Sequence, residues 1–502
     1  MERISLTRLD ASLAAGVTLV AILVRLLAQD GIHLYPDSYQ FMLFAQGLSD
    51  SIPVSSAMGE AGGSWAIPFY KLGYPLLTWP FSALWHDPFA PGLVVSFVAG
   101  TAVVPVVYFL ALAGLRSRLG AAGAAFAVTV SFSAVAWSRF AMSESLAIFW
   151  IASTLLLSVL AGQTRSRLLA ILTALCASVM ILMRLELVLL LPTVVLLVHW
   201  QHGATHDWGF EKRYLVVPGL IAFLVFSVAS GWLAQDVAEG FSLNPGYLLS
   251  KAFSGPVVDD VGVSPAPGTG VATFLTHEPF LVLLAGLGLA IGAKRRDESL
   301  WPLWPGLILL IAVEAPRDDV RFLTTLVPLL AFAAGYGFEV LWGWIRIHLR
   351  QLRPNQALAL SAAVSLGIVL LSVAQVSETE SRWHPEQGYE YELARGIEKQ
   401  VKVHGLRDVV ICTFSPEAVH LISGLPARRL SSPHLDNCAA HPSPHEILVI
   451  VDEAVRRNFG DSFEQEIQSA GTRLFEIPVE APYLQGASVL RNPLPATAYL
   501  LE

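Results

Sequence analysis

One acidic residue, Asp37, stands in a loop that directly follows the first long apolar run of the sequence. It lies in the stretch HLYPDSYQFMLFAQGLSD, residues 33–50. Pro36 favours an extended residue before it, so a helix can begin at Asp37 or Ser38, and either side chain is a candidate N-cap. The chemical alternative is a general base, because a carboxylate held beside a membrane can take a proton from an attacking hydroxyl or amine.

Further charged residues recur near the ends of other apolar runs. WSRFAMSESLAIFW contains Arg139 and Glu144, and MRLELVLLLP contains Arg184 and Glu186. Ionisable groups at membrane depth usually pair with one another or mark a functional cavity, so each of these pairs is either a local ion pair or part of a site. The other candidates are Lys71 and Tyr74 in FYKLGYPLL, and Arg317, Asp318, Asp319 and Arg321 in EAPRDDVRF.

Several cations that converge on one face of a membrane protein can hold a phosphate group. A single arginine is weaker evidence, because long basic side chains also extend to the membrane surface to keep their charge in water. We interpret Arg25, near the end of the first apolar run, in this second way.

The composition predicts the kind of protein that must position these residues. The 502-residue chain is 54% hydrophobic and only 14% charged, with a mean hydropathy of +0.57. Soluble chains carry about 25% charged residues, so this depletion predicts a polytopic α-helical membrane protein. The net charge of −8 argues against a nucleic-acid partner. The first apolar run lacks a small-residue cleavage site and is expected to stay as a signal anchor.

A membrane span needs roughly 20 apolar residues, and the sequence contains about eleven candidate transmembrane helices. Two of them are separated only at Arg184–Glu186, so one long broken helix is the alternative there. The candidates are 11–28, 90–114, 119–137, 145–162, 168–184, 186–200, 214–234, 278–293, 300–314, 322–345 and 355–375.

The basic residues predict how the chain is oriented. With a cytoplasmic N-terminus, every inner segment carries at least two basic residues, as the positive-inside rule requires. Those segments are 1–10, 116–118, 164–167, 211–213, 294–296 and 346–353. We therefore expect an integral protein of the inner or plasma membrane. Its periplasmic or extracellular parts are then residues 29–89, 235–277, 315–321 and the tail from about 376.

The first outer loop, 29–89, is too long for a plain connection between helices. From Tyr39 onward, apolar residues recur at helical spacing, which predicts an amphipathic helix on the bilayer surface. A second such piece is WAIPFYKLGYPLLTWPFSALW, 65–85, whose Trp and Tyr content suits the headgroup layer. Two interfacial helices would form a lid over the outer ends of the spans.

The chain divides into a predicted transmembrane domain, 1–375, and a C-terminal outer α/β domain, 376–502. In the tail, DVVICTF and HEILVIVDEAV read as buried strands, while PEAVHLISG and GDSFEQEIQSAG read as helices that end at glycine. Cys412 and Cys438 both fall in this tail and can pair if it lies in an oxidising compartment. The histidines of HLDNCAAHPSPH match no zinc spacing and predict a surface loop.

Several segments together resemble the GT-C membrane glycosyltransferases. Pro36-Asp37-Ser38-x-x-Phe41 resembles their first outer loop, and FYKLGYPLL is similar to their second interfacial helix. SRFAMSESLAIFW resembles the Arg-Phe…acidic-Ser segment of protein O-mannosyltransferases, and aminoarabinose-lipid A transferases also carry an acid in the comparable segment. MRLELVLLLP and VRFLTTLVPLLAFAAGYG resemble the family's Arg-x-Glu hairpin and its Arg-aromatic-Leu…Pro…Gly span. The resemblance runs in register over about residues 10–345.

The resemblance implies a transfer reaction on the outer side of the membrane. Such enzymes move a sugar, a hexose or a pentose, from a polyprenyl phosphate or diphosphate carrier to a lipid, glycan or protein acceptor. Asp37 matches the catalytic Asp. The residues expected near the donor phosphate or the active-site cavity are Lys71, Tyr74, Arg139, Glu144, Arg184, Glu186 and Arg321.

The residue types suit an inverting displacement. Inversion at the anomeric carbon needs a base opposite the leaving group and positive charge on the departing phosphate. The residue after the loop Asp is often acidic in relatives, but here it is Ser38, so a metal bridging two adjacent acids is not supported. The pattern requires no cofactor, and a divalent metal stays an open alternative.

Two rival functions compete with transfer. A transporter or flippase of lipid-linked sugars would be expected to show paired repeats and ionisable groups near the bilayer midplane. The charged residues instead lie at the outer ends of the spans, with Glu339, deep toward the inner side of its helix, as the nearest exception. A structural or assembly protein that presents the tail domain would need neither the long first loop nor the converging charges.

Overall fold

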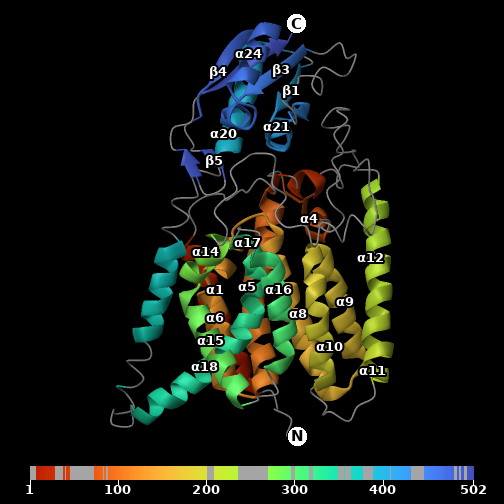
Figure 1. Cartoon of the computed structure of the whole chain (residues 1–502), viewed down its shortest axis with the longest axis vertical. Helices are drawn as coiled ribbons and strands as arrows, with labels where there is room; N and C mark the ends of the chain where they lie inside the picture. Colours follow the sequence, from red (N-terminus) through yellow and green to blue (C-terminus); the bar gives the residue numbers. More distant parts are fainter. Residues whose placement is uncertain are drawn as a thin grey trace.

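The computed structural model describes most of the chain, and the bounds below refer to that part of it. The described residues are 7–28, 38–39, 41–45, 73–82, 84–85, 89–200, 208–235, 269–295, 300–315, 320–348, 356, 363–376, 388–406, 409–430, 446–479, 483–485, 488–490 and 495–501. They form a long helical bundle with a small sheet and its covering helices at one end (Figure 1). We call this end of the bundle the sheet end.

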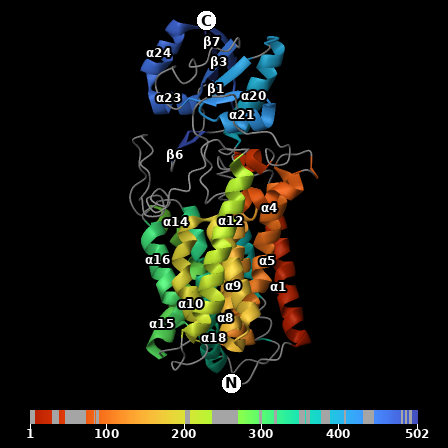
Figure 2. The ribbon, with the colours of Figure 1, turned by 90° about the vertical axis from the view of Figure 1, so that its right-hand side faces the viewer.

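The bundle contains long helices, most of which run in roughly the same direction, and several short helical pieces (Figure 2). They are α1 (Arg8–Leu27), α4 (Gly73–Ser82), α5 (Ala90–Leu115), α6 (Arg118–Thr129), α7 (Phe132–Trp137), α8 (Ser143–Thr164), α9 (Arg167–Met183), η2 (Leu185–Leu190), α10 (Leu191–Trp200), α11 (Gly209–Glu211), η3 (Lys212–Val216), α12 (Val217–Gln235), α14 (Thr269–His277), α15 (Pro279–Arg295), η4 (Trp301–Leu303), α16 (Trp304–Glu314), α17 (Val320–Leu323), η6 (Thr324–Leu326), α18 (Val327–His348) and the helix Ala363–Val376.

The described residues of each predicted span are mostly helical, but the helices differ in length. Within the described residues, four helices are long and apolar enough to cross a membrane: Arg8–Leu27, Ala90–Leu115, Ser143–Thr164 and Thr324–Ile347. The pair α14–α15, bent by 96°, gives a fifth if it is one span. Four shorter apolar helices coincide with further predicted spans. The number of eleven spans therefore stays a prediction.

Two sharp turns at the opposite end of the bundle use the same three residues, Arg-Ser-Arg. Arg116 and Arg165 end α5 and α8 in the left-handed conformation, with φ of 57° and 53°. The serine that follows each of them caps the next helix, because its Oγ accepts a backbone N–H of the first turn. The sequence thus encodes both helix ends locally.

Residues 168–200 form a hairpin and not one broken helix. Arg184 is extended, with φ of −156° and ψ of 119°, and it ends α9. His199 at the end of α10 and Arg165, which precedes α9, both contact Glu211, with His199 Nδ1 3.4 Å and Arg165 Nη1 3.0 Å from its Oε1. The start of α9 and the end of α10 therefore lie at the same end of the bundle.

The described part of the first outer loop differs from the predicted surface helix. Residues 38–39 and 41–45 are helical, and all of them are buried. Tyr39 packs against Phe89 and Phe41 against Tyr74, while Glu390 and Tyr391 lie close enough to Tyr39 to interact electrostatically. An amphipathic surface helix would keep one face in water, whereas the described residues of this helix are all covered by other parts of the chain. The second piece, α4, does expose Trp79 and Phe81.

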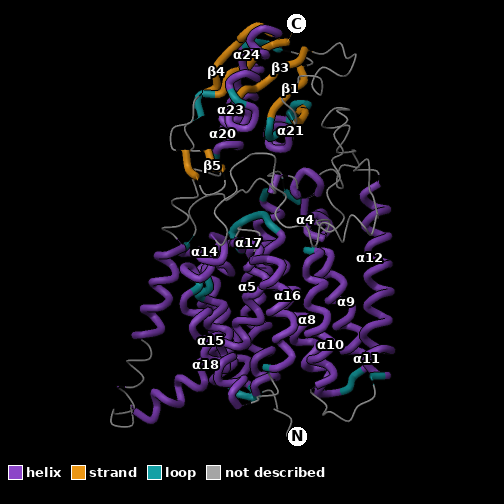
Figure 3. The backbone as a smooth tube through the Cα atoms, in the orientation of Figure 1, coloured by secondary structure: helices purple, strands orange, loops and turns teal. Residues whose placement is uncertain are grey.

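A five-stranded sheet follows the bundle, as the orange strands of Figure 3 show. Its order is β2-β1-β3-β7-β4. The strands β2, β1 and β3 are parallel, and β7 is antiparallel to both β3 and β4. Strands β5 and β6 form a separate antiparallel pair. The elements are α20 (Tyr389–Val403), β1 (Val409–Thr413), α21 (Pro416–Ser423), β2 (Ala427–Arg429), β3 (Glu446–Val451), α23 (Glu453–Phe459), α24 (Asp461–Ala470), β4 (Gly471–Ile477), β5 (Tyr483–Gln485), β6 (Ser488–Leu490) and β7 (Ala496–Leu501).

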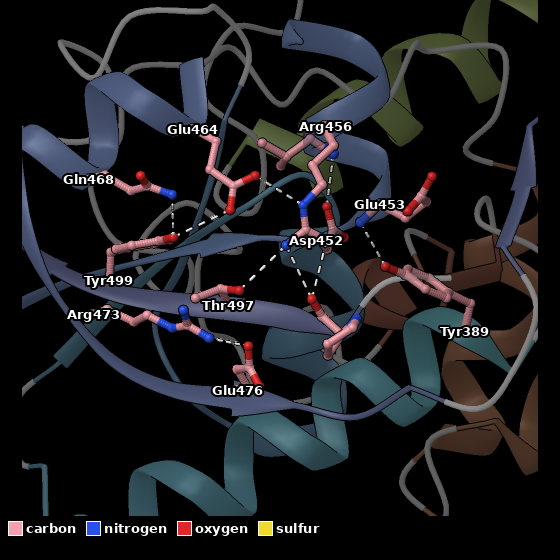
Figure 4. A network of polar contacts seen from close by, with 12 residues as sticks. Tyr389, Asp452, Glu453, Arg456, Glu464, Gln468, Arg473, Glu476, Thr497 and Tyr499 are labelled. Atoms are coloured by element: carbon pink, nitrogen blue, oxygen red, sulfur yellow. Dashed lines mark hydrogen bonds and ion pairs between the residues drawn. The ribbon is translucent and has the colours of Figure 1, made fainter. Parts of the chain in front are cut away.

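Helices cover both faces of this sheet because its strands alternate their side chains. Leu448 and Ile450 of β3 pack with α20, while Val449 and Val451 pack with α23 and α24. Near the second face, polar side chains join in a chain of contacts (Figure 4). Arg456 Nε donates to Glu464 at 3.1 Å. The strands and helices predicted from the tail sequence are confirmed, except that the strand of HEILVIVDEAV ends at Val451 and its last residues, from Glu453, belong to α23.

The sheet region rests directly on the bundle. Ala418 of α21 belongs to the main hydrophobic core of the bundle, and Leu421, Ile422 and Tyr391 pack against that core. α20 and α21 therefore join the sheet to the sheet end of the helices.

Candidate active site

The described candidate residues gather at the sheet end of the bundle. Glu144 lies in the first turn of α8, and α8 ends next to Arg165, which contacts Glu211 of α11 at the opposite end (Figure 1). Arg184 follows α9, which returns from that opposite end. The two residues, forty positions apart in the sequence, are thereby brought together.

Arg184 is the centre of a buried ionic cluster. Its Nε donates to Glu186 Oε1 at 2.6 Å, and its Nη1 lies 3.6 Å from Glu144 Oε1. Nη1 also lies 3.5 Å from the backbone oxygen of Arg321, to which it donates. Arg184, Glu144 and Glu186 are only 6%, 4% and 7% exposed. The predicted Arg184–Glu186 pair is confirmed, but it is one part of a larger group.

A further acid, Glu314, completes this cluster and was not singled out from the sequence. It lies at the end of α16, is 1% exposed and interacts electrostatically with Arg184. The sequence feature that could have pointed to Glu314 is an acid at the end of an apolar run, the same feature that marked Glu144. With three carboxylates around it, the charge of Arg184 is neutralised within the protein. Arg184 therefore organises the cluster more than it offers charge to a ligand.

Tyr74 of α4 is fully buried beside the cluster, and its hydroxyl is engaged. The hydroxyl donates to Gly92 O at 2.9 Å and lies 2.9 Å from Ser96 Oγ. Ser96 Oγ in turn donates to Met142 O at 3.2 Å, two residues before Glu144. Tyr74 thus joins α4 to α5 and to the start of α8.

The structure leaves part of the predicted site undescribed. Asp37 and Lys71 lie outside the described residues, as do Arg317, Asp318 and Asp319. Asp37 directly precedes a described helical residue, Ser38, which is fully buried. Within the described part of the chain, no group of three or more His, Cys, Asp or Glu is arranged to hold a metal ion.

Arg139 and Arg321 also lie at the sheet end. Arg139 follows α7 directly after Ser138 and is 6% exposed. Arg321 lies in α17, and its backbone oxygen accepts from both Arg184 and Thr324. All six candidates that the structure describes are therefore at one end: Tyr74, Arg139, Glu144, Arg184, Glu186 and Arg321.

The sequence interpretation of Arg25 was wrong. It was expected to extend to the membrane surface, but it is fully buried. Its Nη1 and Nη2 donate to Ala21 O and Ala134 O, each at 3.2 Å. The carbonyl of Ala134 lies 109 residues further along the chain, so no local sequence pattern predicts this contact.

The fold was compared with solved structures. ArnT from Cupriavidus metallidurans, in a crystal structure bound to undecaprenyl phosphate, matches with a TM-score of 0.63 at 12% identity, over 97% of each chain. The oligosaccharyltransferase from Archaeoglobus fulgidus, in its apo form, matches with a TM-score of 0.58 at 12% identity, over 93% of this chain and 73% of that one. The chain has the GT-C fold.

Further comparisons agree at the level of fold. Archaeal AglB from Archaeoglobus fulgidus, in complex with an inhibitory peptide and a dolichol-phosphate, matches with a TM-score of 0.56 at 10% identity, over 97% of this chain and 77% of that one. No protein-family model and no curated protein matches the sequence. The resemblance inferred from the residues is confirmed for the GT-C fold, and the match extends beyond residue 345 into the sheet region.

Proposed function

We propose that this chain is a glycosyltransferase that takes a sugar from a polyprenyl-phosphate carrier. The observation that carries the proposal is the shared fold with ArnT bound to undecaprenyl phosphate, over 97% of both chains. The candidate residues that the structure describes gather at one end of this fold, and a carrier whose phosphate lies at the membrane surface would meet the protein at such an end. AglB in complex with a dolichol-phosphate supports the same class of donor.

In the proposed reaction, Asp37 is the general base. It takes the proton from an acceptor hydroxyl or amine, whose oxygen or nitrogen attacks the anomeric carbon. The bond from that carbon to the phosphate oxygen breaks, and the phosphate leaves with the electron pair. Base and leaving group on opposite sides of the sugar make the transfer inverting. Asp37 directly precedes the buried helical residues at the sheet end, which supports this role.

Cations are proposed to stabilise the departing phosphate. Lys71 lies two residues before α4, and Arg321 and Arg139 lie at the same end of the bundle. Fixed positive charge where negative charge develops lowers the barrier most effectively in a site that excludes water. The Arg184 cluster is proposed as the buried base of this site: it holds three carboxylates and one cation, so it does not itself supply positive charge to the phosphate.

The reaction is proposed to occur on the outer face of the inner or plasma membrane, with the N-terminus in the cytoplasm. Cys412 in β1 is disulfide-bonded, and Cys438 lies outside the described residues. Disulfides are rare in the cytosol, so an oxidised Cys412 supports a periplasmic or extracellular sheet domain, residues 376–502. The acceptor is then a lipid, a glycan or a protein on that side.

The test is sugar transfer by the purified chain and by Asp37→Asn. The chain is reconstituted with a panel of radiolabelled polyprenyl-phosphate hexoses and pentoses, and label transfer to lipid, glycan or peptide acceptors is measured. Loss of a general base lowers turnover about 10²- to 10⁴-fold. Asp461→Asn on α24 is the matched control and should transfer at the wild-type rate. Binding of the carrier should persist in Asp37→Asn.

Two results would count against the proposal. Turnover of Asp37→Asn within twofold of wild type removes the proposed base. Movement of an intact lipid-linked sugar across a proteoliposome membrane, without transfer to any acceptor, identifies a flippase instead. The position of the described charged cluster at the end of the bundle favours transfer over that alternative.

A further inference from the structure

The third predicted span is interrupted between α6 and α7. α6 ends at Thr129, and α7 begins at Phe132. Ser131 caps α7, because its Oγ accepts from Ala134 N. Such a break leaves backbone groups without partners inside the helix, and in an apolar bundle these groups must be satisfied by neighbouring side chains.

Side chains from three other parts of the bundle bind at this break or just after it. Glu278 Oε1, at the bend between α14 and α15, accepts from Ser131 Oγ at 2.7 Å and from Ser133 N at 2.6 Å. Ser372 Oγ, on the helix Ala363–Val376, donates to Val130 O at 2.7 Å. Arg25 Nη2 donates to Ala134 O at 3.2 Å. The N-terminus of α7 is therefore held from several sides.

Burying the carboxyl group of Glu278 to bind the start of α7 costs free energy. Glu278 is 2% exposed, and its Oε1 accepts from Ser131 Oγ and Ser133 N at the α6–α7 break. Ionisable residues inside a membrane bundle are costly, and they usually mark a functional requirement. The proposed reaction does not use Glu278. Its role must therefore lie in the position of α7, the helix that it binds.

The other end of α7 leads into the candidate site. α7 ends at Trp137, Arg139 follows Ser138, and Glu144 lies in the first turn of α8. Between them, Met142 O accepts from Ser96 Oγ at 3.2 Å. α7 has six residues and so is about 9 Å long, at 1.5 Å per residue. A tilt of about 10° at its N-terminus would displace its other end by roughly 1.5 Å.

We propose that Glu278 is a positioning residue: it fixes the tilt of α7 and thereby places Arg139 and Glu144 in the site. This inference rests on the proposed function. A displacement of about 1 Å in a reacting group can lower the rate by up to about 10²-fold. The carboxyl of Glu278 acts through α7, without touching the substrate.

The test compares Glu278→Ala, Glu278→Gln and the wild type in detergent. Glutamine keeps an oxygen that can accept from Ser131 and Ser133, whereas alanine removes it. We expect the amides of residues 133–137 to exchange hydrogen at least tenfold faster in Glu278→Ala, and kcat/KM for the lipid-linked donor to fall about 10- to 100-fold. In Glu278→Gln, both the exchange rates of residues 133–137 and kcat/KM should be close to those of the wild type.

Asp10→Ala is the matched control. Asp10 is also a buried carboxylate at a helix start, where it accepts from Thr7 N at 2.8 Å and Arg118 Nε at 2.7 Å, but it lies at the opposite end of the bundle. It should lower thermal stability and leave kcat/KM of the folded protein unchanged. A purely structural Glu278 would behave in the same way.

The outcomes separate this inference from the proposed function. Unchanged exchange at residues 133–137 in Glu278→Ala overturns the inference, whatever the activity. Faster exchange with unchanged kcat/KM also overturns it, because α7 would then move without affecting the site. A wild-type chain that transfers no sugar overturns the proposed function instead, while the exchange rates still decide whether Glu278 holds α7.

Discussion

Replacing Arg184 tests whether the buried cluster is held together as the structure shows. In Arg184→Met, Glu144 and Glu186 lose a cation 3.6 Å and 2.6 Å away, and both stay buried. Breaking a buried ion pair by removing one partner typically costs about 3–5 kcal/mol. The expected result is a fall in Tm of roughly 5–10 °C in detergent.

The magnitude can be checked with a mutant cycle. Adding Glu186→Gln to Arg184→Met removes one uncompensated carboxylate, so the double variant should be more stable than Arg184→Met alone. We expect a coupling energy of about 1–3 kcal/mol between the two sites. The measurement is thermal unfolding of the four proteins in one detergent, with carrier binding followed as a shift of Tm.

An exposed ion pair provides the control. Arg395 and Glu398 on α20 lie 2.9 Å apart, with the Arg395 side chain 54% exposed. Arg395→Met should cost less than about 1 kcal/mol, because exposed pairs are worth little. Equal losses for Arg184→Met and Arg395→Met, or a coupling of zero between Arg184 and Glu186, would refute the reasoning about burial.

Two further predictions address the packing of α4 and the pH dependence of the sheet region. In Gly73→Ala, the new Cβ would lie 2.5 Å from Met183 Cε and 2.8 Å from the backbone oxygen of Leu182. Gly73→Ala should therefore lower the free energy of unfolding by about 1–3 kcal/mol and slow transfer. In the control Gly286→Ala, the new Cβ meets nothing within 4 Å, so neither Tm nor turnover should change. Burial raises the pKa of Asp452 from 3.8 to about 6, so the native state holds this proton more tightly than the unfolded chain and stability falls as pH rises from about 4 to 6. Asp452→Asn, which keeps an N-cap acceptor for Val455 N, should be more stable than wild type by roughly 1–3 kcal/mol at pH 8 and by little near pH 3.5; a pH-independent difference in unfolding temperature would contradict this.

The helices and strands could be predicted because their signals are local. Apolar runs of membrane-spanning length mark the bundle helices, and Val- and Ile-rich runs mark β1 and β3. Gly424, with φ of 72°, ends α21 where the sequence predicted a helix end. These features depend on neighbours within a few residues, which the sequence displays directly.

The cluster was only partly predictable because its contacts are distant in the sequence. The Arg184–Glu186 pair, two residues apart, was among the alternatives, but the contact from Arg184 to Glu144 spans forty residues. Glu278 binds Ser131 across 147 residues, and no periodicity connects the two. Single acids at the ends of apolar runs are the available signal, and they do not say which partner each acid meets.

The burial of the first-loop helix was missed for a similar reason. Its residues follow a helical apolar pattern that suits a membrane surface equally well. Tyr39 is buried because Phe89 packs against it and because α20, some 350 residues later, lies over the same region. An apolar stripe in a sequence shows that something covers it, without saying whether lipid or protein does so.

The contact of α21 with the bundle has a consequence for how this protein is made. Ala418 belongs to the same hydrophobic core as Ala14, at the other end of the chain. During synthesis the early helices enter the membrane long before residue 418 leaves the ribosome. The core at the sheet end therefore closes only when the last part of the chain has been delivered and folded, so a translation product that stops at 376 would carry the helices without this cover.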